Sequence, residues 1–469
     1  MNARRILIVG LDSVPYDVFF DTRGSRRPFI ERLRRDGYGG ILRSCDPPIT
    51  VPAWAVMASG LPPRQLGLYG FRIRGSDPYA GFVLPSSGSI QEPCLWDYFN
   101  GNGENVWVVG VPPGYPPRSV RGHWISCFLT PSGASCTSPA DFQETLEKWV
   151  GGRYRADAEF RKEDRDLTLA QVYETSNQKF KILDRIVQED DWRFAMSVDI
   201  GPDRLHHAFW KYHDVRHPGY VKGNKYQDVL PDYYRFLDGK LGELMDRLPD
   251  DTVLMIVSDH GTKGMEGCFC VNEWLIRQGY LRLKKYPETV LPLDRCDVDW
   301  DRTTAWAWGG YYARVFVNLK GREPRGTVPA EHYDVFRVKL KGELEDVRGP
   351  RGEEWKTRAV LSEPDWKGDP PDLMVSFDAL SQRAAGTVGH QRLYLTENDT
   401  GPDDSVHSPD GIFWCGYKQG GRFRKDLFRK SHDNLLVDIL DVAPTVAALT
   451  GSTGRADWAG QPALLWEER

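Results

Sequence analysis

Five acidic and histidine side chains follow short apolar runs of the chain, where a parallel sheet would present them to a ligand. They are Asp12, Asp203, His207, Asp259 and His260. In an open parallel sheet, ligands bind beyond the carboxyl ends of the strands. Carboxylate oxygens combined with imidazole nitrogens suit Zn²⁺, Mn²⁺ or Fe²⁺ better than Ca²⁺. We therefore predict a site for divalent metal ions, with zinc as the preferred candidate.

The spacing of these residues supports shared ligation. Asp203 and His207 are four residues apart, so on a helix both side chains would point from one face and could hold one ion. Asp259 and His260 are adjacent, and a tight turn after a strand would let them diverge toward neighbouring sites. Gly261 eases such a turn because it lacks a side chain.

Thr50 is the candidate nucleophile. A helix is predicted from Val51 to Ser59, ending at Gly60, and Thr50 would be its N-cap. That position places a hydroxyl beside free backbone N–H groups and the positive end of the helix dipole, where phosphate oxygens bind well. A hydroxyl that also touches a metal can ionise near neutral pH and attack phosphorus.

The elements that must position these residues belong to an α/β fold. Runs rich in Val, Ile and Leu are predicted as buried strands at 5–9, 40–43, 106–109, 194–198, 253–257 and 412–414. Helical patterns lie between the strands. One covers 28–35 and another follows a 3.6-residue period over 237–248. This alternation predicts a mostly parallel central sheet flanked by helices.

Two regions depart from this pattern. The segment 285–400 is richer in turns and polar residues, and we predict that it forms a smaller inserted cap. Residues 1–284 and 401–469 would then form the catalytic core. The loop-rich stretch 118–165 is expected to lie over the site.

The composition limits the classes of molecule that the protein is expected to bind. The 469 residues include 61 basic and 66 acidic ones, a formal net charge of -5, so we expect a small phosphorylated substrate and no long nucleic acid. No apolar run approaches the ~20 residues of a membrane span. The apolar stretch after residue 5 is too short for a signal peptide, and together with eight scattered cysteines it favours a cytoplasmic protein. The oligomeric state stays open.

The order of these motifs resembles the alkaline phosphatase superfamily. The resemblance is strongest to its nucleotide pyrophosphatase/phosphodiesterase branch and to prokaryotic phosphohydrolase and phosphomutase relatives. It rests on Thr50 followed by Val-Pro-Ala-Trp, on the Asp203-x3-His207 element, on Asp259-His260, on a late His407, and on the segments 272–281 and 318–324.

The resemblance implies an alkaline-phosphatase-like core and two metals about 4 Å apart. One metal would be held by Asp203, His207 and His407. The other would be held by Asp12, Thr50, Asp259 and His260. It also implies hydrolysis of a phosphodiester or phosphoanhydride through a phospho-threonine intermediate. His407 precedes its predicted strand, so its place in the site rests on the resemblance alone.

Several alternatives remain open. Animal diesterases of this branch hold a phosphate oxygen with an Asn where this chain has Phe71, and Arg72 or Arg74 is expected to replace that contact. A phosphomonoesterase or phosphomutase is therefore the rival activity, and a metal-binding regulatory protein without turnover is the non-enzyme alternative. A sulfatase is disfavoured, because Trp54 stands where sulfatases carry Arg. Trp308, together with Trp306, is a candidate for stacking on a base or ring.

Taken singly, most of these residues also have an ordinary explanation, whereas Asp259 and His260, at the end of an apolar strand, need a partner or a metal. Asp12 suits a helix cap, and Asp203 with His207 suits a local hydrogen-bonded pair. The metal-site prediction therefore depends on the whole set occurring in order.

Overall fold

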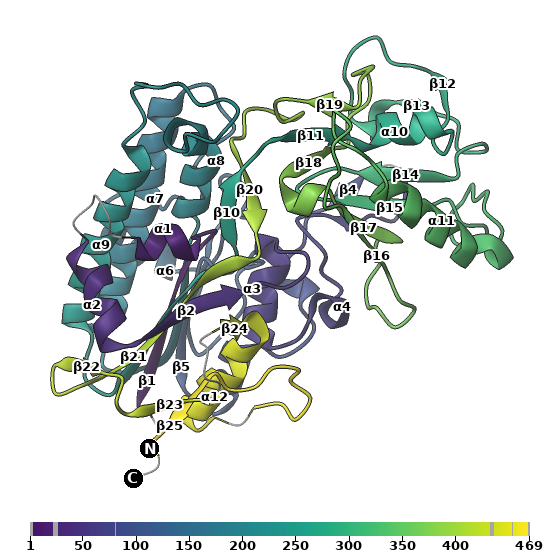
Figure 1. The fold of residues 1–469 in the computed structure, drawn as a ribbon. Helices are drawn as coiled ribbons and strands as arrows, with labels where there is room; N and C mark the ends of the chain where they lie inside the picture. The colour runs from purple at the N-terminus through teal and green to yellow at the C-terminus, as the bar shows by residue number, and fades with distance from the viewer. Residues whose placement is uncertain (1–2, 22–26, 80, 432–435, 453, 468–469) are drawn as a thin grey trace.

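A large twisted sheet forms the centre of the molecule in the computed structural model, which describes residues 3–21, 27–79, 81–431, 436–452 and 454–467 (Figure 1). In spatial order its strands are β24 (Leu436–Asp438), β2 (Tyr38–Arg43), β21 (Asp410–Gln419), β9 (Thr252–Val257), β1 (Arg5–Leu11), β8 (Trp192–Asp199), β5 (Asn105–Val109), β6 (Gly122–Ile125) and β7 (Thr137–Ser138), with β22 (Arg422–Arg424) beside β21.

The sheet is mostly parallel, as predicted. Strand β1 runs parallel to both β8 and β9, and β5 runs parallel to β8 and β6. Strand β21 is antiparallel to its neighbours β2 and β9. All six predicted strands lie in this sheet, several of them longer than the apolar runs that predicted them.

Helices cover both faces of the sheet. Successive residues of β1 point to opposite faces, and all of them are buried, so neither face is open to solvent there. Leu7, Val9 and Leu11 belong to one hydrophobic cluster, and Ile6 and Ile8 belong to another. The helices of the first cluster are α1 (Tyr16–Phe20), α2 (Pro28–Asp36), α6 (Phe142–Val150), α7 (Arg165–Ile186), α8 (Gly201–His213) and α9 (Val229–Arg247). Those of the second are α3 (Thr50–Ser59), α4 (Pro63–Leu66), α5 (Leu95–Gly101) and α12 (Val442–Thr450).

A smaller lobe lies beside this core, on the right in Figure 1. Its four-stranded antiparallel sheet has the order β14 (Ala305–Trp308), β15 (Ala313–Val317), β17 (Leu373–Ser376) and β16 (Arg358–Leu361). A second sheet contains β18 (Gln382–Ala385), β11 (Gly267–Cys270) and β19 (Tyr394–Leu395). Two helices complete the lobe, α10 (Val271–Gln278) and α11 (Tyr333–Glu345).

The smaller lobe has its own hydrophobic cluster, which also takes in Phe269 and Leu275 from before residue 285. The division of the chain at 285 and 401 stays a prediction.

Short strand pairs join the remaining segments. They are β3 (Ile73–Arg74) with β4 (Phe82–Val83), β10 (Gly261–Gly264) with β20 (Ser405–Ser408), β12 (Leu283–Lys285) with β13 (Asp297–Val298), and β23 (Phe428–Lys430) with β25 (Leu464–Trp466). Within the described ranges, no helix is both long enough and apolar enough to cross a bilayer.

Candidate active site

The seven predicted site residues converge at the carboxyl end of the central sheet. Asp12 directly follows β1, and Asp259 and His260 follow β9. Asp203 and His207 lie on α8, one turn apart, so their side chains share a face as predicted. All seven residues are buried, each at 1% exposure or less.

Strand β20 explains how His407 joins them. This strand pairs antiparallel with β10, which comes directly after His260, and His407 lies opposite Thr262. The ladder thus places a residue from near the end of the chain beside the motif that follows β9.

Thr50, Asp12, Asp259 and His260 form one group of ligand atoms. The Thr50 hydroxyl oxygen lies 3.2 Å from His260 Nε2 and 3.5 Å from Asp12 Oδ1. His260 Nε2 also lies 3.2 Å from Asp259 Oδ2 and 3.7 Å from Asp12 Oδ1. These atoms therefore point into one small space.

Asp203, His207 and His407 form the second group. Asp203 Oδ1 lies 3.2 Å from His207 Nε2 and 3.8 Å from His407 Nε2. The His260 and His407 rings stack at a centroid distance of 3.8 Å. Asp203, His260 and His407 can also offer ligand atoms that all lie within 4.8 Å of one another, so His260 reaches both groups.

Each histidine has its Nδ1 atom engaged, which leaves Nε2 facing the other ligands. His407 Nδ1 lies 2.9 Å from the Pro48 carbonyl, and His260 Nδ1 lies 3.0 Å from the Gly261 carbonyl. His207 Nδ1 lies 2.6 Å from Asp403 Oδ1. An N–H donated at Nδ1 fixes the tautomer that presents a lone pair at Nε2, the arrangement usual for metal-binding histidines.

Several buried atoms of the cluster lack hydrogen-bond partners in the structure. They are Asp203 Oδ1, Asp259 Oδ2 and His407 Nε2. A buried polar atom without a partner costs free energy, and a bound cation would satisfy all three of these acceptors. The donor set of carboxylates and imidazoles therefore fits divalent metal ions.

The electrostatics of the cluster agree with this fit. Burial raises the pKa of Asp12 well above its usual value, and the neighbouring charge of Asp203 raises it further. The pKa of Asp259 is also raised well above its usual value, mainly by burial and next by the charge of Asp12. Burial also acts to raise the pKa of Asp203, but His207 and Arg204 outweigh it and hold that pKa well below its usual range. The raised pKa values show that ionising all three carboxylates in this buried space is unfavourable without a compensating positive charge, which bound cations would supply.

The structure corrects one detail at Thr50. The residue is the first of helix α3, whose N-cap is Ile49, so Thr50 does not occupy the cap position. Its hydroxyl is turned instead toward Asp12 and His260, because the helix begins one residue earlier than predicted.

Three further residues support the cluster and were not predicted as part of it. Trp54 donates its indole N–H to Asp12 Oδ2 at 2.7 Å, and Gly10 leaves room for the indole, since a Cβ there would lie 2.3 Å from the ring. Asp403 holds His207. Tyr311 places its hydroxyl 3.0 Å from His207 Nε2 and stacks on His407 at 3.7 Å. Of these three residues, only Trp54 could have been placed near the cluster from the sequence, because it follows Thr50 by about one helical turn.

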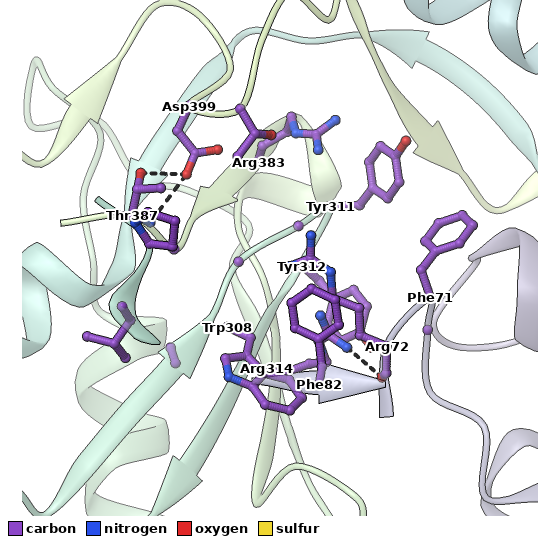
Figure 2. Close-up of a pocket in the computed structure, with 18 of the residues that line it drawn as sticks. Phe71, Arg72, Phe82, Trp308, Tyr311, Tyr312, Arg314, Arg383, Thr387 and Asp399 are labelled. Atoms are coloured by element: carbon purple, nitrogen blue, oxygen red, sulfur yellow. Dashed lines mark hydrogen bonds between the residues drawn. The ribbon is translucent and has the colours of Figure 1, made fainter. Parts of the chain in front are cut away.

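A pocket of about 460 Å³ adjoins the cluster, within the usual range for small-molecule sites (Figure 2). Ile49, Arg204 and Tyr311 line its end at the cluster. Phe128, Phe160 and Arg161 of the stretch 118–165 line it too, as predicted for that stretch. Trp306 and Trp308, the two candidates for stacking, both line the pocket. Trp308 is half-buried, whereas Trp306 is 1% exposed and belongs to the hydrophobic cluster of the smaller lobe.

The family model described as type I phosphodiesterase/nucleotide pyrophosphatase matches residues 6–403 of the chain. The chain belongs to this family. Its members are metalloenzymes that hydrolyse phosphoesters, and the chain is accordingly a phosphoester hydrolase. His407 lies just beyond the matched residues, so its inclusion in the site rests on the geometry above.

Solved structures share this fold. Phosphonoacetate hydrolase from Sinorhizobium meliloti 1021, in complex with phosphonoformate, matches with a TM-score of 0.56 and 16% identity over 94% of each chain. An inactive variant of murine ectonucleotide pyrophosphatase/phosphodiesterase 5, in complex with AMP, matches with a TM-score of 0.53 and 12% identity over 98% of this chain and 100% of that one. Among curated proteins, none matches the sequence.

Proposed function

We propose that the chain hydrolyses a phosphodiester or phosphoanhydride through a phospho-threonine intermediate, at a site that holds two divalent metal ions. The observation that carries this proposal is the position of the Thr50 hydroxyl. It lies at the start of α3, within 3.5 Å of Asp12 and of His260, where both ligand groups meet. The inactive murine relative, in which a threonine is replaced by alanine, supports a threonine nucleophile.

The ligands divide into two sets that share a boundary at His260. Asp12, Asp259, His260 and Thr50 would hold one ion. Asp203, His207 and His407 would hold the other. Bound there, divalent cations would neutralise phosphate charge, lower the pKa of the Thr50 hydroxyl and activate water. We propose zinc as the metal, because carboxylate and imidazole ligands suit it.

The residues of the chain perform the two displacements as follows. Thr50 Oγ1 loses its proton and attacks phosphorus, and the bond to the leaving oxygen breaks. The first-turn backbone N–H groups of α3 and the positive end of its dipole stabilise the negative charge that develops on the phosphoryl oxygens. The leaving group departs toward the adjoining pocket. Water then attacks the phosphorus carried by Thr50, the bond between phosphorus and Thr50 Oγ1 breaks, and the phosphate product leaves. The threonine oxygen takes its proton from the attacking water.

The test compares bis-p-nitrophenyl phosphate with p-nitrophenyl phosphate, with zinc added and with Thr50→Ala as the control. We expect a diester preference in the wild type and loss of at least about 10³-fold in the variant, as for removal of other nucleophiles. A monoester preference would favour the phosphatase or phosphomutase alternative. Equal rates for wild type and variant would contradict the nucleophile.

A further inference from the structure

Six arginines line the pocket beside the cluster, and they differ in whether a carboxylate neutralises them. They are Arg72, Arg161, Arg204, Arg295, Arg314 and Arg383. Arg204 pairs with Asp157 and Asp203, and both Arg161 and Arg383 pair with Asp403. Each of these three arginines therefore has a carboxylate partner, although Arg161 and Arg383 share the single carboxylate of Asp403.

Arg314 is different, because it is buried without a counter-ion. Its exposure is 6%, and no carboxylate of the described chain lies within ion-pair distance of its guanidinium. One terminal nitrogen donates to the Arg72 carbonyl at 2.9 Å, while Nε has no partner. An uncompensated buried charge is costly, so a site that retains one usually serves a ligand of opposite charge.

Arg72 lies beside Arg314 and also lacks a carboxylate partner in the described chain (Figure 2). Its guanidinium lies over the Phe82 ring at 3.9 Å, and that of Arg314 lies 5.2 Å from the Trp308 ring. Arg72 is exposed as a whole residue, but its guanidinium is partly desolvated against the pocket wall. This desolvation lowers the pKa of Arg72 to about 10, with Arg314 and Arg161 contributing repulsion. The two guanidiniums are thus held by aromatic rings rather than by carboxylates.

Arg74, the other predicted phosphate-binding candidate, is engaged elsewhere. It pairs with Glu323 at 2.7 Å and with Asp369 at 3.1 Å, so its charge is compensated. The acidic lining residues do not neutralise Arg72 or Arg314 either, since Asp399 accepts hydrogen bonds from Thr387 and Asp294 makes no ion pair with them. Arg295, an exposed lining residue, also makes no ion pair in the described chain. Arg72 and Arg314 are the two guanidiniums without a carboxylate partner that lie next to each other in this pocket.

We propose that Arg72 and Arg314 bind a second anionic group of the substrate, a phosphate, phosphonate or carboxylate carried by one ester substituent. The inference rests on the proposed function, because it places the scissile phosphorus at Thr50 and one substituent in the pocket. Planar guanidiniums suit bidentate recognition of such anions. The substrate class is then an organic phosphodiester with a further negative charge, flanked by the aromatic wall of Phe82 and Trp308.

The test uses three diesters that all release p-nitrophenolate: phenyl, 4-carboxyphenyl and 4-phosphonophenyl p-nitrophenyl phosphate. We expect kcat/KM for at least one charged diester to exceed that for the neutral one by tenfold or more, and the better of the two identifies the anion. Arg314→Met and Arg72→Met should each reduce this ratio to below about threefold, and Arg72→Lys should retain part of it. Arg35→Met, an exposed arginine on α2, should leave the ratio unchanged.

Equal kcat/KM for neutral and charged diesters would overturn the second-anion proposal while the proposed function stood. If no diester is cleaved, the proposed function fails. The second-anion proposal is then tested separately by measuring the binding of phosphate monoesters. Calorimetry on the Thr50→Ala protein should then show 4-carboxyphenyl phosphate or 4-phosphonophenyl phosphate binding at least tenfold tighter than phenyl phosphate. Loss of that difference in Arg314→Met supports the proposal, and its persistence overturns it.

Thermal melting separates this role from a structural one. Because Arg314 is a buried charge without a counter-ion, Arg314→Met should melt no lower than the wild type in the absence of substrate. A drop of several degrees would show that the guanidinium serves the fold, and would overturn the proposal.

Discussion

At the scale of single residues, the indole of Trp54 is expected to hold Asp12 in position for metal binding. Its N–H donates to Asp12 Oδ2 at 2.7 Å, and both side chains are fully buried. Trp54→Phe removes this hydrogen bond, so we expect zinc affinity or kcat/KM on a diester to fall about 10- to 100-fold. Zinc titration against a competing chelator measures the first quantity.

Trp96→Phe is the matched control. Trp96 is also buried, at 2% exposure, but its indole N–H has no hydrogen-bond partner. If both variants lose zinc affinity equally, packing rather than the bond to Asp12 explains the result.

Asp403 is the second residue to test, because it links His207 to two arginines. Its Oδ1 lies 2.6 Å from His207 Nδ1, and its Oδ2 accepts from Arg161 and Arg383. Asp403→Asn keeps the shape but removes the charge, so kcat/KM should fall about 10- to 100-fold. Asp404→Asn is the control, since Asp404 is also buried but its carboxylate pairs with Lys211 and Arg165 and not with a predicted ligand, so kcat/KM should fall much less. Equal losses would contradict the positioning role of Asp403.

The sequence indicated the seven cluster residues because their types and order are distinctive. It could not indicate Asp403 or Tyr311, since these contact His207 from segments about 200 and 100 residues away. The Thr50 prediction placed the hydroxyl in the right neighbourhood but at the wrong helix position, because helix boundaries depend on local geometry that sequence patterns define only within a residue or two.

At the scale of elements, the strands of the central sheet were predictable because continuous apolar runs are typical of strands buried on both faces. The β10–β20 ladder was not, because Gly261–Gly264 and Ser405–Ser408 show no apolar periodicity. That ladder is what brings His407 to the site.

Helix α7 carries a buried cation, and its effect on the free energy of unfolding can be measured. Lys179 is 2% exposed and donates to the Tyr154 hydroxyl. Burial lowers its pKa to about 8, below the model-peptide value of 10.5. Between these values the unfolded chain holds a proton that the folded chain releases, so stability attributable to Lys179 rises with pH across this window. The penalty is therefore present in full below about pH 8.

Lys179→Met removes this penalty. We expect the variant to gain roughly 2 kcal/mol of unfolding free energy at pH 7 and to gain little or nothing near pH 10.5. Urea unfolding of both proteins at the two pH values measures the difference, and buried tyrosines and cysteines common to both cancel. A gain that is constant with pH would show that Lys179 titrates normally in the folded state.

At the scale of the whole molecule, the site joins the two lobes. Tyr311, from the loop between β14 and β15, bonds to His207 and stacks on His407, while every predicted ligand comes from the core. The pocket is likewise lined by both parts, with Phe71 and Phe128 on one side and Trp308 and Arg314 on the other. Cations bound in the cluster would therefore stabilise the contact between the lobes as well as the carboxylates.

Metal removal tests this coupling. A ligand that binds only the folded state adds about 4 kcal/mol when its free concentration is 1,000 times its Kd. Chelation should then lower the melting temperature by on the order of 5 °C. It should also speed proteolysis of the smaller lobe, because Tyr311 would lose its fixed partners. Thr50→Ala, which keeps the other six ligands, should retain most of the shift, whereas the Asp12→Asn/Asp259→Asn double variant should lose much of it. An unchanged melting temperature in the wild type, with no metal found by elemental analysis, would contradict the assignment of these residues as metal ligands.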